Sequence, residues 1–120
     1  MSESEAIRRT QIAQLNDELR IDPLSGTSGR VMMTRGVGAL GSEFMLKALD
    51  ALAGLKPHDF ETGNDPYRER DFAVFEVDGE RLYAKIDYYE KGSDYLAGAE
   101  TPEDASKTDR VLTLMLAEEY

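Results

Sequence analysis

A helix over residues 4–20 is predicted by apolar residues that recur at helical spacing, namely Ile12, Leu15 and Leu19. Pro23 forces this helix to stop shortly after residue 20. Its apolar stripe is narrow, so the helix packs either on the rest of the chain or on a helix of a partner. Both alternatives stay open. We therefore treat residues 1–22 as an N-terminal amphipathic helix and residues 23–120 as a single domain.

Residues 30–37, RVMMTRGV, favour a short strand, and residues 42–55 favour a second helix. Gly54 stands where a helix commonly ends in the left-handed conformation. The stretch from 56 to 71 is rich in turn residues, among them Asn64-Asp65-Pro66. The helix over 42–55 is expected to cover a sheet because it has a broad apolar face, formed by Phe44, Met45, Leu49 and Leu52.

A β-hairpin is predicted around Asp78-Gly79, because the segments on either side alternate between apolar and polar residues in FAVFEV-DG-ERLYAKIDYY. Asp-Gly between such segments is typical of a two-residue type I′ turn. That turn fixes the register, with the expected pairs Val77–Glu80, Glu76–Arg81, Phe75–Leu82, Val74–Tyr83 and Ala73–Ala84. One face of the hairpin then carries Ala73, Phe75, Leu82, Ala84, Ile86 and Tyr88.

The segment after the polar residues 90–109 fits a strand or a helix, and we favour a strand because of the alternation in RVLTLML. Together these elements predict an α+β fold. It has a mainly antiparallel sheet of about four strands, with the helix over 42–55 packed on one face and an N-terminal amphipathic helix beside it.

Composition excludes several kinds of chemistry. The 120 residues include no cysteine and one histidine, His58, which excludes disulfides, thiolate nucleophiles and any site that needs two histidines. No apolar run approaches the roughly 18 residues that a membrane span needs. The start, MSESEAIRRTQ, lacks the apolar region of a signal peptide. We expect a cytoplasmic protein that uses no cofactor and does not bind membranes.

The net charge of −10 is unevenly distributed along the chain. Residues 1–35 hold five acidic and five basic residues, so residues 36–120 hold 19 acidic and 9 basic ones. Such a surface repels phosphate backbones and attracts basic proteins. Direct binding to nucleic acid is therefore not expected, whereas a basic protein partner is. Alternatively, the acidic excess serves only to keep the protein soluble and implies no partner.

Carboxylates offer a second functional hypothesis. A loop and a strand end often meet at the rim of a sheet, where oxygen ligands can gather around Mg²⁺ or Ca²⁺. The candidate ligands are Asp65, Glu69, Asp71 and Asp87. A metal-dependent hydrolase or nuclease is therefore one alternative function, although turn chemistry explains Asp65 equally well. His58 lies in a loop and is expected to be solvated rather than catalytic.

Tyrosines mark the face of the hairpin that is turned away from the core. In the predicted register Tyr83, Phe72 and Tyr89 lie on this face, whereas Tyr88 points toward the core. The face is too apolar to be wholly solvated. Either the N-terminal helix covers it, or it is a contact surface in which tyrosines bring large area at low entropic cost.

Four blocks of the sequence resemble a family of short bacterial proteins, often carried on plasmids and phages, that is classed as a domain of unknown function. The blocks are TRGVGAL (34–40), NDPYRERDFAVFE (64–76), KIDYYE (85–90) and TDRVLTLMLAEEY (108–120). The resemblance covers residues 30–120 and implies no established activity. The chain departs from it at Arg68 and Arg70, where the family has glycine and histidine, which argues further against an enzyme.

We expect a non-enzymatic module that binds a basic protein through an acidic, tyrosine-bearing surface. The setting that the resemblance implies points to an inhibitor of a host nucleic-acid-processing defence, such as a restriction or CRISPR effector. The residues expected to make the contact are Asp87, Tyr89, Glu90, Asp94, Tyr95, Glu100, Glu103 and Asp104. A third possibility is a homo-oligomeric structural protein that pairs through the first helix or the outer sheet face.

Overall fold

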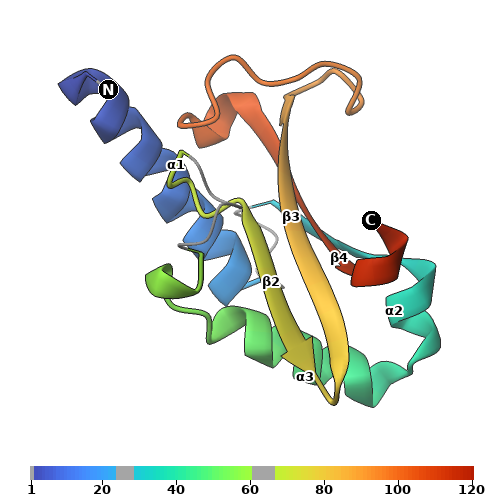
Figure 1. Ribbon diagram of the computed structural model, residues 1–120. Coiled ribbons are helices and arrows are strands. Elements are labelled where there is room, and N and C mark those ends of the chain that lie inside the picture. The colour runs from blue at the N-terminus through green and yellow to red at the C-terminus, as the bar shows by residue number, and fades with distance from the viewer. Residues whose placement is uncertain (1, 24–28, 61–66) are drawn as a thin grey trace.

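The computed structural model describes residues 2–23, 29–60 and 67–120 (Figure 1). Its helices are α1 (Glu3–Ile21), α2 (Arg35–Ala39) and α3 (Ser42–Ala53), and its strands are β1 (Arg30–Met33), β2 (Phe72–Val77), β3 (Glu80–Glu90) and β4 (Thr108–Leu116). Short 3-10 helices follow at η1 (Pro57–Phe60), η2 (Ala105–Lys107) and η3 (Ala117–Glu119). The predicted α+β class is confirmed. The turn predicted at Asn64-Asp65-Pro66 lies outside the described residues.

The four strands form one sheet in the order β1-β4-β3-β2. The pairs β2–β3 and β3–β4 are antiparallel, and β1 pairs with β4 in parallel. The segment for which the sequence favours a strand over a helix is β4, and β4 joins β1 to the rest of the sheet. The sheet is mainly antiparallel, as predicted, with one parallel pair that the local pattern does not indicate.

The hairpin prediction is confirmed in all five residue pairs, from Val77 opposite Glu80 to Ala73 opposite Ala84. Asp78 and Gly79 have φ values of 51° and 80°, which are the left-handed conformations that a type I′ turn requires. The turn and the alternation of apolar residues agree, so a register slip of one residue would place the buried face in solvent.

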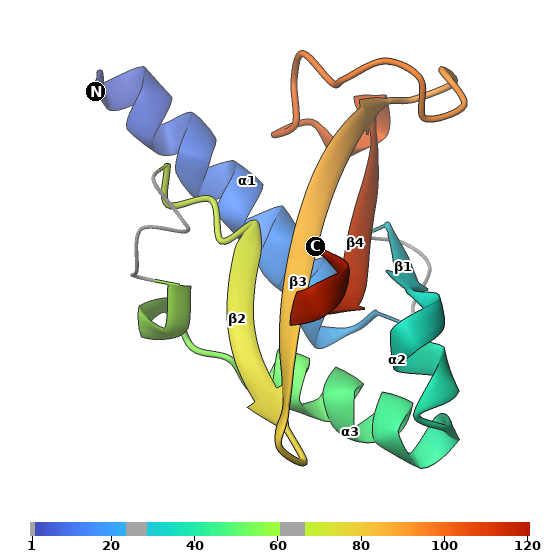
Figure 2. The ribbon, with the colours of Figure 1, turned by 45° about the vertical axis from the view of Figure 1, so that its right-hand side comes forward.

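The core lies between one face of the sheet and the helices α1 and α3 (Figures 1 and 2). Phe44, Ala48 and Leu52 of α3 pack against residues from the three longer strands, which include Ala73, Leu82, Ala84, Ile86, Leu112 and Leu114. Tyr88 and Phe75 border this core, so the predicted inward face of the hairpin is confirmed. Burial of these side chains contributes about 25 cal/mol per Å² of apolar surface.

α1 packs on the core side of the sheet. Leu19, on its last turn, is 1% exposed and belongs to the core. The interpretation in which this helix covers the outer face of the hairpin is therefore wrong. Its buried side also includes two polar residues, Asn16 and Arg20, and their hydrogen bonds to other elements hold α1 in a defined position.

Two predicted boundaries are wrong. The strand expected over residues 30–37 ends at Met33, because the Thr34 side chain accepts a hydrogen bond from the Val37 backbone and begins α2. The expected left-handed end at Gly54 does not form, because its φ is −82°. There the guanidinium of Arg20 donates from Nη1 to the carbonyls of Leu52 and Leu55, both at 2.9 Å, and thereby satisfies the end of α3.

None of the helices within the described ranges is long and apolar enough to cross a membrane.

Candidate functional site

The outer face of the sheet is the face directed away from α1 and α3 (Figure 2). Side chains alternate along each strand, so the register determines which residues occupy this face. They are Arg30 and Met32 of β1, Phe72, Val74 and Glu76 of β2, Arg81, Tyr83, Lys85, Asp87 and Tyr89 of β3, and Asp109, Val111, Thr113 and Met115 of β4. Neither α1 nor α3 covers them.

The first aromatic cluster on the outer face consists of Phe72, Tyr83 and Tyr120. The ring centroids lie 5.3 Å apart for Phe72 and Tyr83, 5.7 Å for Phe72 and Tyr120, and 5.4 Å for Tyr83 and Tyr120. Tyr120 meets both other rings edge to face, which is a favoured arrangement of aromatic rings. Tyr120 nevertheless keeps 73% of its surface exposed, so the cluster remains accessible from outside.

Glu119 holds the segment that carries Tyr120. Its carboxylate accepts hydrogen bonds from Thr34 Oγ1 at 2.6 Å, from the Leu116 backbone at 2.8 Å and from the Gly36 backbone at 3.0 Å. The hydrogen bond from Thr34 is the largest of the effects that lower the pKa of Glu119 below its ordinary value. The carboxylate thus connects η3 to the start of α2 and positions Tyr120 over the sheet.

The second aromatic cluster consists of Tyr89, Tyr95 and Arg30. The rings of Tyr89 and Tyr95 meet edge to face at 5.6 Å, and the Arg30 guanidinium lies 5.4 Å from the centre of the Tyr95 ring. Tyr95 comes from the loop that follows β3 and is 40% exposed, next to Leu96 at 88%. Hydrogen bonds from Glu90 N to Ala97 O and from Ala99 N to Tyr88 O hold this loop against the strand.

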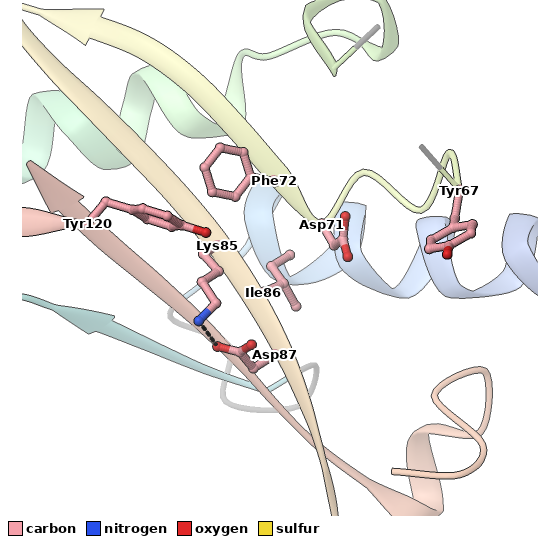
Figure 3. A pocket seen from close by; sticks show the side chains of 7 residues that line it. All are labelled: Tyr67, Asp71, Phe72, Lys85, Ile86, Asp87 and Tyr120. Carbon is pink, nitrogen blue, oxygen red and sulfur yellow. Dashed lines mark ion pairs between the residues drawn. The ribbon is translucent and has the colours of Figure 1, made fainter. Parts of the chain in front are cut away.

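A hollow, which we call the central hollow, adjoins the first cluster on the outer face (Figure 3). Its volume is about 330 Å³, and its lining residues are Tyr67, Asp71, Phe72, Lys85, Ile86, Asp87 and Tyr120. Two of these lining residues, Lys85 and Asp87, form an ion pair of 3.3 Å between Nζ and Oδ2 (Figure 3). The hollow therefore combines three aromatic side chains with two carboxylates and one amine.

The structure brings together three of the residues predicted to contact a partner. Asp87 and Tyr89 are neighbours on the outer face, and Tyr95 joins Tyr89 in the second cluster. Glu90 and Asp94 are exposed at the same end of β3. Asp87, Tyr89 and Tyr95 thus lie together at this end of the outer face, and their role as contact residues stays a prediction.

The other three predicted residues lie elsewhere and have structural partners. Arg8 of α1 pairs with Glu103 at 3.1 Å and donates to the Glu100 carbonyl at 3.2 Å. Burial alone would raise the pKa of Glu103, but hydrogen bonds from the backbone and from Arg8 outweigh it and lower the pKa. Asp104 accepts from the Ser106 hydroxyl at 2.6 Å and caps η2, which lowers its pKa.

Carboxylates are not confined to the outer face. Exposed ones occur on α1, on α3 and at the hairpin turn, for example Glu5, Asp50 and Asp78. The outer face itself carries equal numbers of acidic and basic side chains, with Glu76, Asp87 and Asp109 against Arg30, Arg81 and Lys85. Near the second cluster, the strands contribute Asp87 and Asp109 on the outer face, and the loop contributes Asp94 beside Tyr95. Glu90, the last residue of β3, lies on the opposite face from Tyr89 because side chains alternate along the strand.

The predicted metal site does not form among the described residues, in which no group of three or more histidine, aspartate or glutamate side chains is placed to hold an ion. Glu69 lies on the core side, where it pairs with Arg9 at 3.3 Å and accepts from the Tyr88 hydroxyl at 3.1 Å. Asp87 lies on the outer face, so the sheet separates these two carboxylates. Asp65 lies outside the described residues.

A family model described as "Protein of unknown function (DUF3768)" matches residues 33–119. The chain belongs to this family. The matched segment contains β2, β3 and β4 with most of the outer face, whereas α1, Arg30 and Tyr120 lie outside it. No curated protein and no solved structure matches the chain.

In this member of the family, a buried polar network joins α1 to the sheet. Asn16 Nδ2 donates to the Tyr88 hydroxyl at 2.8 Å and to the Glu69 carbonyl at 2.9 Å, while Asn16 Oδ1 accepts from Arg110 Nε at 2.6 Å. Arg110 also lies 5.0 Å over the Tyr88 ring. Burial raises the pKa of Tyr88 and lowers that of Arg110. Tyr88 is thus a neutral structural anchor.

Sequence reasoning missed this network, although it placed Tyr88 correctly. A signal was present, because Asn16 occupies the apolar stripe of the helix between Ile12 and Leu19. An amide on such a stripe needs buried partners. Their identity depends on contacts with Tyr88 and Arg110, which are distant in the chain.

Proposed function

We propose that the protein is a non-enzymatic binding module that engages a basic protein through the outer face of its sheet. The observation that carries this proposal is the pair of tyrosine-bearing aromatic clusters on a face that neither α1 nor α3 covers. Tyrosines are enriched in protein interfaces because they bring large apolar area together with a hydroxyl that can form hydrogen bonds.

Charge supports a protein partner rather than a nucleic acid. Proteins that bind single-stranded DNA or RNA without sequence preference also present aromatic rings, but they require a positively charged groove for the nucleic-acid backbone. This chain has a net charge of −10, and its outer face carries no excess of basic side chains. Asp94 is exposed next to Tyr95, and Glu90 is exposed at the same end of β3, so both would steer a cationic surface toward Tyr89 and Tyr95.

The partner class that we propose is a protein with a cationic nucleic-acid channel. An inhibitor of a restriction or CRISPR effector is one function of this kind, and the resemblance to proteins carried on plasmids and phages supports it by analogy. The contact residues in this proposal are Asp87, Tyr89, Glu90, Asp94 and Tyr95. Glu100, Glu103 and Asp104 contribute to the acidic field, although Glu103 is paired with Arg8.

Binding to purified restriction and CRISPR effector proteins tests the proposal. We expect complex formation whose affinity falls by about tenfold or more from low salt to high salt, because steering between surface charges is screened. The Tyr95→Ala and Glu90→Lys variants should each weaken the complex. Glu43→Lys on α3 makes the same charge change on the opposite side of the sheet and serves as the matched control.

Two outcomes would overturn the proposal. One is that none of the effectors tested forms a salt-sensitive complex with the protein. The other is a complex that Tyr95→Ala and Glu90→Lys weaken no more than Glu43→Lys does. Light scattering of the protein alone tests the remaining candidate occupant of the outer face, a second copy of the chain. A dimer that the Tyr95→Ala variant dissociates would favour a homo-oligomer over the proposed partner.

A further inference from the structure

The central hollow places aromatic rings beside carboxylates. Tyr67, Phe72 and Tyr120 supply the rings, and Asp71 and Asp87 supply the carboxylates (Figure 3). The volume of about 330 Å³ is near the lower limit, about 300 Å³, of pockets that hold small ligands. A hollow of this size suits one side chain of a partner rather than a larger molecule.

We infer that the central hollow receives an arginine side chain of the basic partner. This inference rests on the proposed function, because it names the group of the partner that the outer face recognises. A guanidinium is planar and weakly hydrated, so it stacks on aromatic rings and donates two parallel hydrogen bonds to a carboxylate. Phe72 and Tyr120 supply surfaces for stacking, and Asp87 supplies the acceptor.

The ion pair of Lys85 with Asp87 does not block this contact. Its atoms are 3.3 Å apart, and the two side chains are 43% and 33% exposed. An ion pair with this exposure is weak, because solvent screens it and both side chains lose conformational freedom. An incoming guanidinium therefore replaces the Lys85 amine at Asp87, and Lys85 acts as a competitor for the carboxylate.

The chain already uses this chemistry at the border of the hollow. The guanidinium of Arg9 lies 4.2 Å from the centre of the Tyr67 ring, while its Nη1 pairs with Glu69 at 3.3 Å. Arg30 packs over Tyr95 in the second cluster. Stacking of a guanidinium on a tyrosine is thus a recurrent arrangement in the described part of the chain.

An anion is the alternative occupant, because Lys85 could bind it. Among the residues that line the hollow in the described chain, Lys85 is the one cationic side chain, and its amine is already paired with Asp87. An anion bound to this amine would lie beside the Asp87 carboxylate, which repels it. The charge of the hollow therefore favours a cation.

A titration followed by ¹H–¹⁵N NMR tests the inference directly. The probe is N-acetyl-arginine methylamide, and the comparison probes are the citrulline analogue, which has the same shape without charge, the lysine analogue and inorganic phosphate. We expect saturable shifts of the backbone signals of Phe72, Lys85 and Asp87 with the arginine probe, and weaker or absent shifts with the others.

Variants then test the roles of the two charged residues. Asp87→Asn should lower the affinity for the arginine probe by about two- to fivefold, as expected for loss of a partly exposed ion pair. Asp50→Asn on α3 removes the same charge from the opposite side of the sheet and should leave the affinity unchanged. Lys85→Met should tighten binding, because it removes the competitor; loss of folding cannot produce that result.

Three outcomes would overturn the inference. The citrulline analogue could bind as tightly as the arginine probe, or phosphate could bind more tightly than it. The third is an affinity for the arginine probe that neither Asp87→Asn nor Lys85→Met changes. Failure of the inference can be distinguished from failure of the proposed function. If the effector complex depends on Tyr95 but the arginine probe does not bind, only this inference fails. If the probe binds in the hollow but no salt-sensitive effector complex forms, only the proposed function fails.

Discussion

Asn16 of α1 and Tyr88 of β3 are joined by a hydrogen bond of 2.8 Å between Asn16 Nδ2 and the Tyr88 hydroxyl. The other side of the same amide accepts from Arg110 Nε at 2.6 Å. One amide thus connects a helix to two neighbouring strands in a region that solvent hardly reaches. Such a network specifies one position of the helix, because any shift would leave buried polar groups without partners.

Replacing Asn16 with alanine should lower the free energy of unfolding by about 2–4 kcal/mol, because it leaves the Arg110 guanidinium and the Tyr88 hydroxyl short of partners. Urea denaturation measures this change. Gln14→Ala, at an exposed position of the same helix, is the control and should have little effect. In a double-mutant cycle with Tyr88→Phe, we expect a coupling energy of about 0.5–3 kcal/mol. Strictly additive effects would contradict the network.

Removing residues 2–22 should abolish cooperative unfolding. The deletion uncovers the core on the side where Leu19 is 1% exposed, and it leaves Arg110 without Asn16. It also removes Arg20, whose guanidinium satisfies the last carbonyls of α3. Circular dichroism and the binding of a hydrophobic dye provide the measurement. A truncated chain that keeps its melting temperature would show that α1 is a separable arm.

Stability should depend on the ionisation of Glu119 in acid. Hydrogen bonds, first from Thr34, lower the pKa of this carboxylate below its ordinary value of 4.5. Its stabilising contribution is therefore present above the unfolded pKa and is lost as the pH falls through the lower folded pKa. Urea midpoints of the wild type and Glu119→Gln should differ at neutral pH and converge in acid. A constant difference across that range would contradict the assignment.

Two glycines should respond oppositely to alanine. At Gly29, φ is 147° and an added Cβ would lie 2.5 Å from the Arg110 carbonyl oxygen, so Gly29→Ala should destabilise by about 2 kcal/mol or more. Gly38 lies inside α2 with no other atom within 4 Å of an added Cβ, so Gly38→Ala should stabilise by about 0.5–1 kcal/mol. Thermal unfolding distinguishes the two. Equal effects would contradict the close approach at Gly29.

The hairpin was predictable because its information is local. Asp78-Gly79 fixes the turn, and the alternation of apolar residues fixes which side faces the core, so Tyr88 and Tyr89 could be assigned to opposite faces. The same reasoning placed Asp87 and Tyr89 on one surface. In each case the turn and the side-chain period point to the same answer.

The remaining features depend on contacts between distant segments. No short stretch of the sequence indicates that β1 pairs with β4. The side of the sheet on which α1 packs cannot be predicted from a short stretch either. Glu103 was grouped with the contact residues because it adds negative charge within the polar residues 90–109. Its partner, Arg8, is near the start of the chain. A charge in such a loop can be assigned a role only once the fold has determined its neighbours.

The central place of β4 in the sheet has a consequence for biosynthesis. β1 leaves the ribosome early, yet the strand beside it in the described sheet is β4, which is the last strand to emerge. Until then the apolar sides of α1, β1 and α3 have no complete surface to cover, and pairing of such distant segments is slow. The nascent chain is therefore expected to complete its fold only after β4 has emerged, and to need protection from aggregation until that moment.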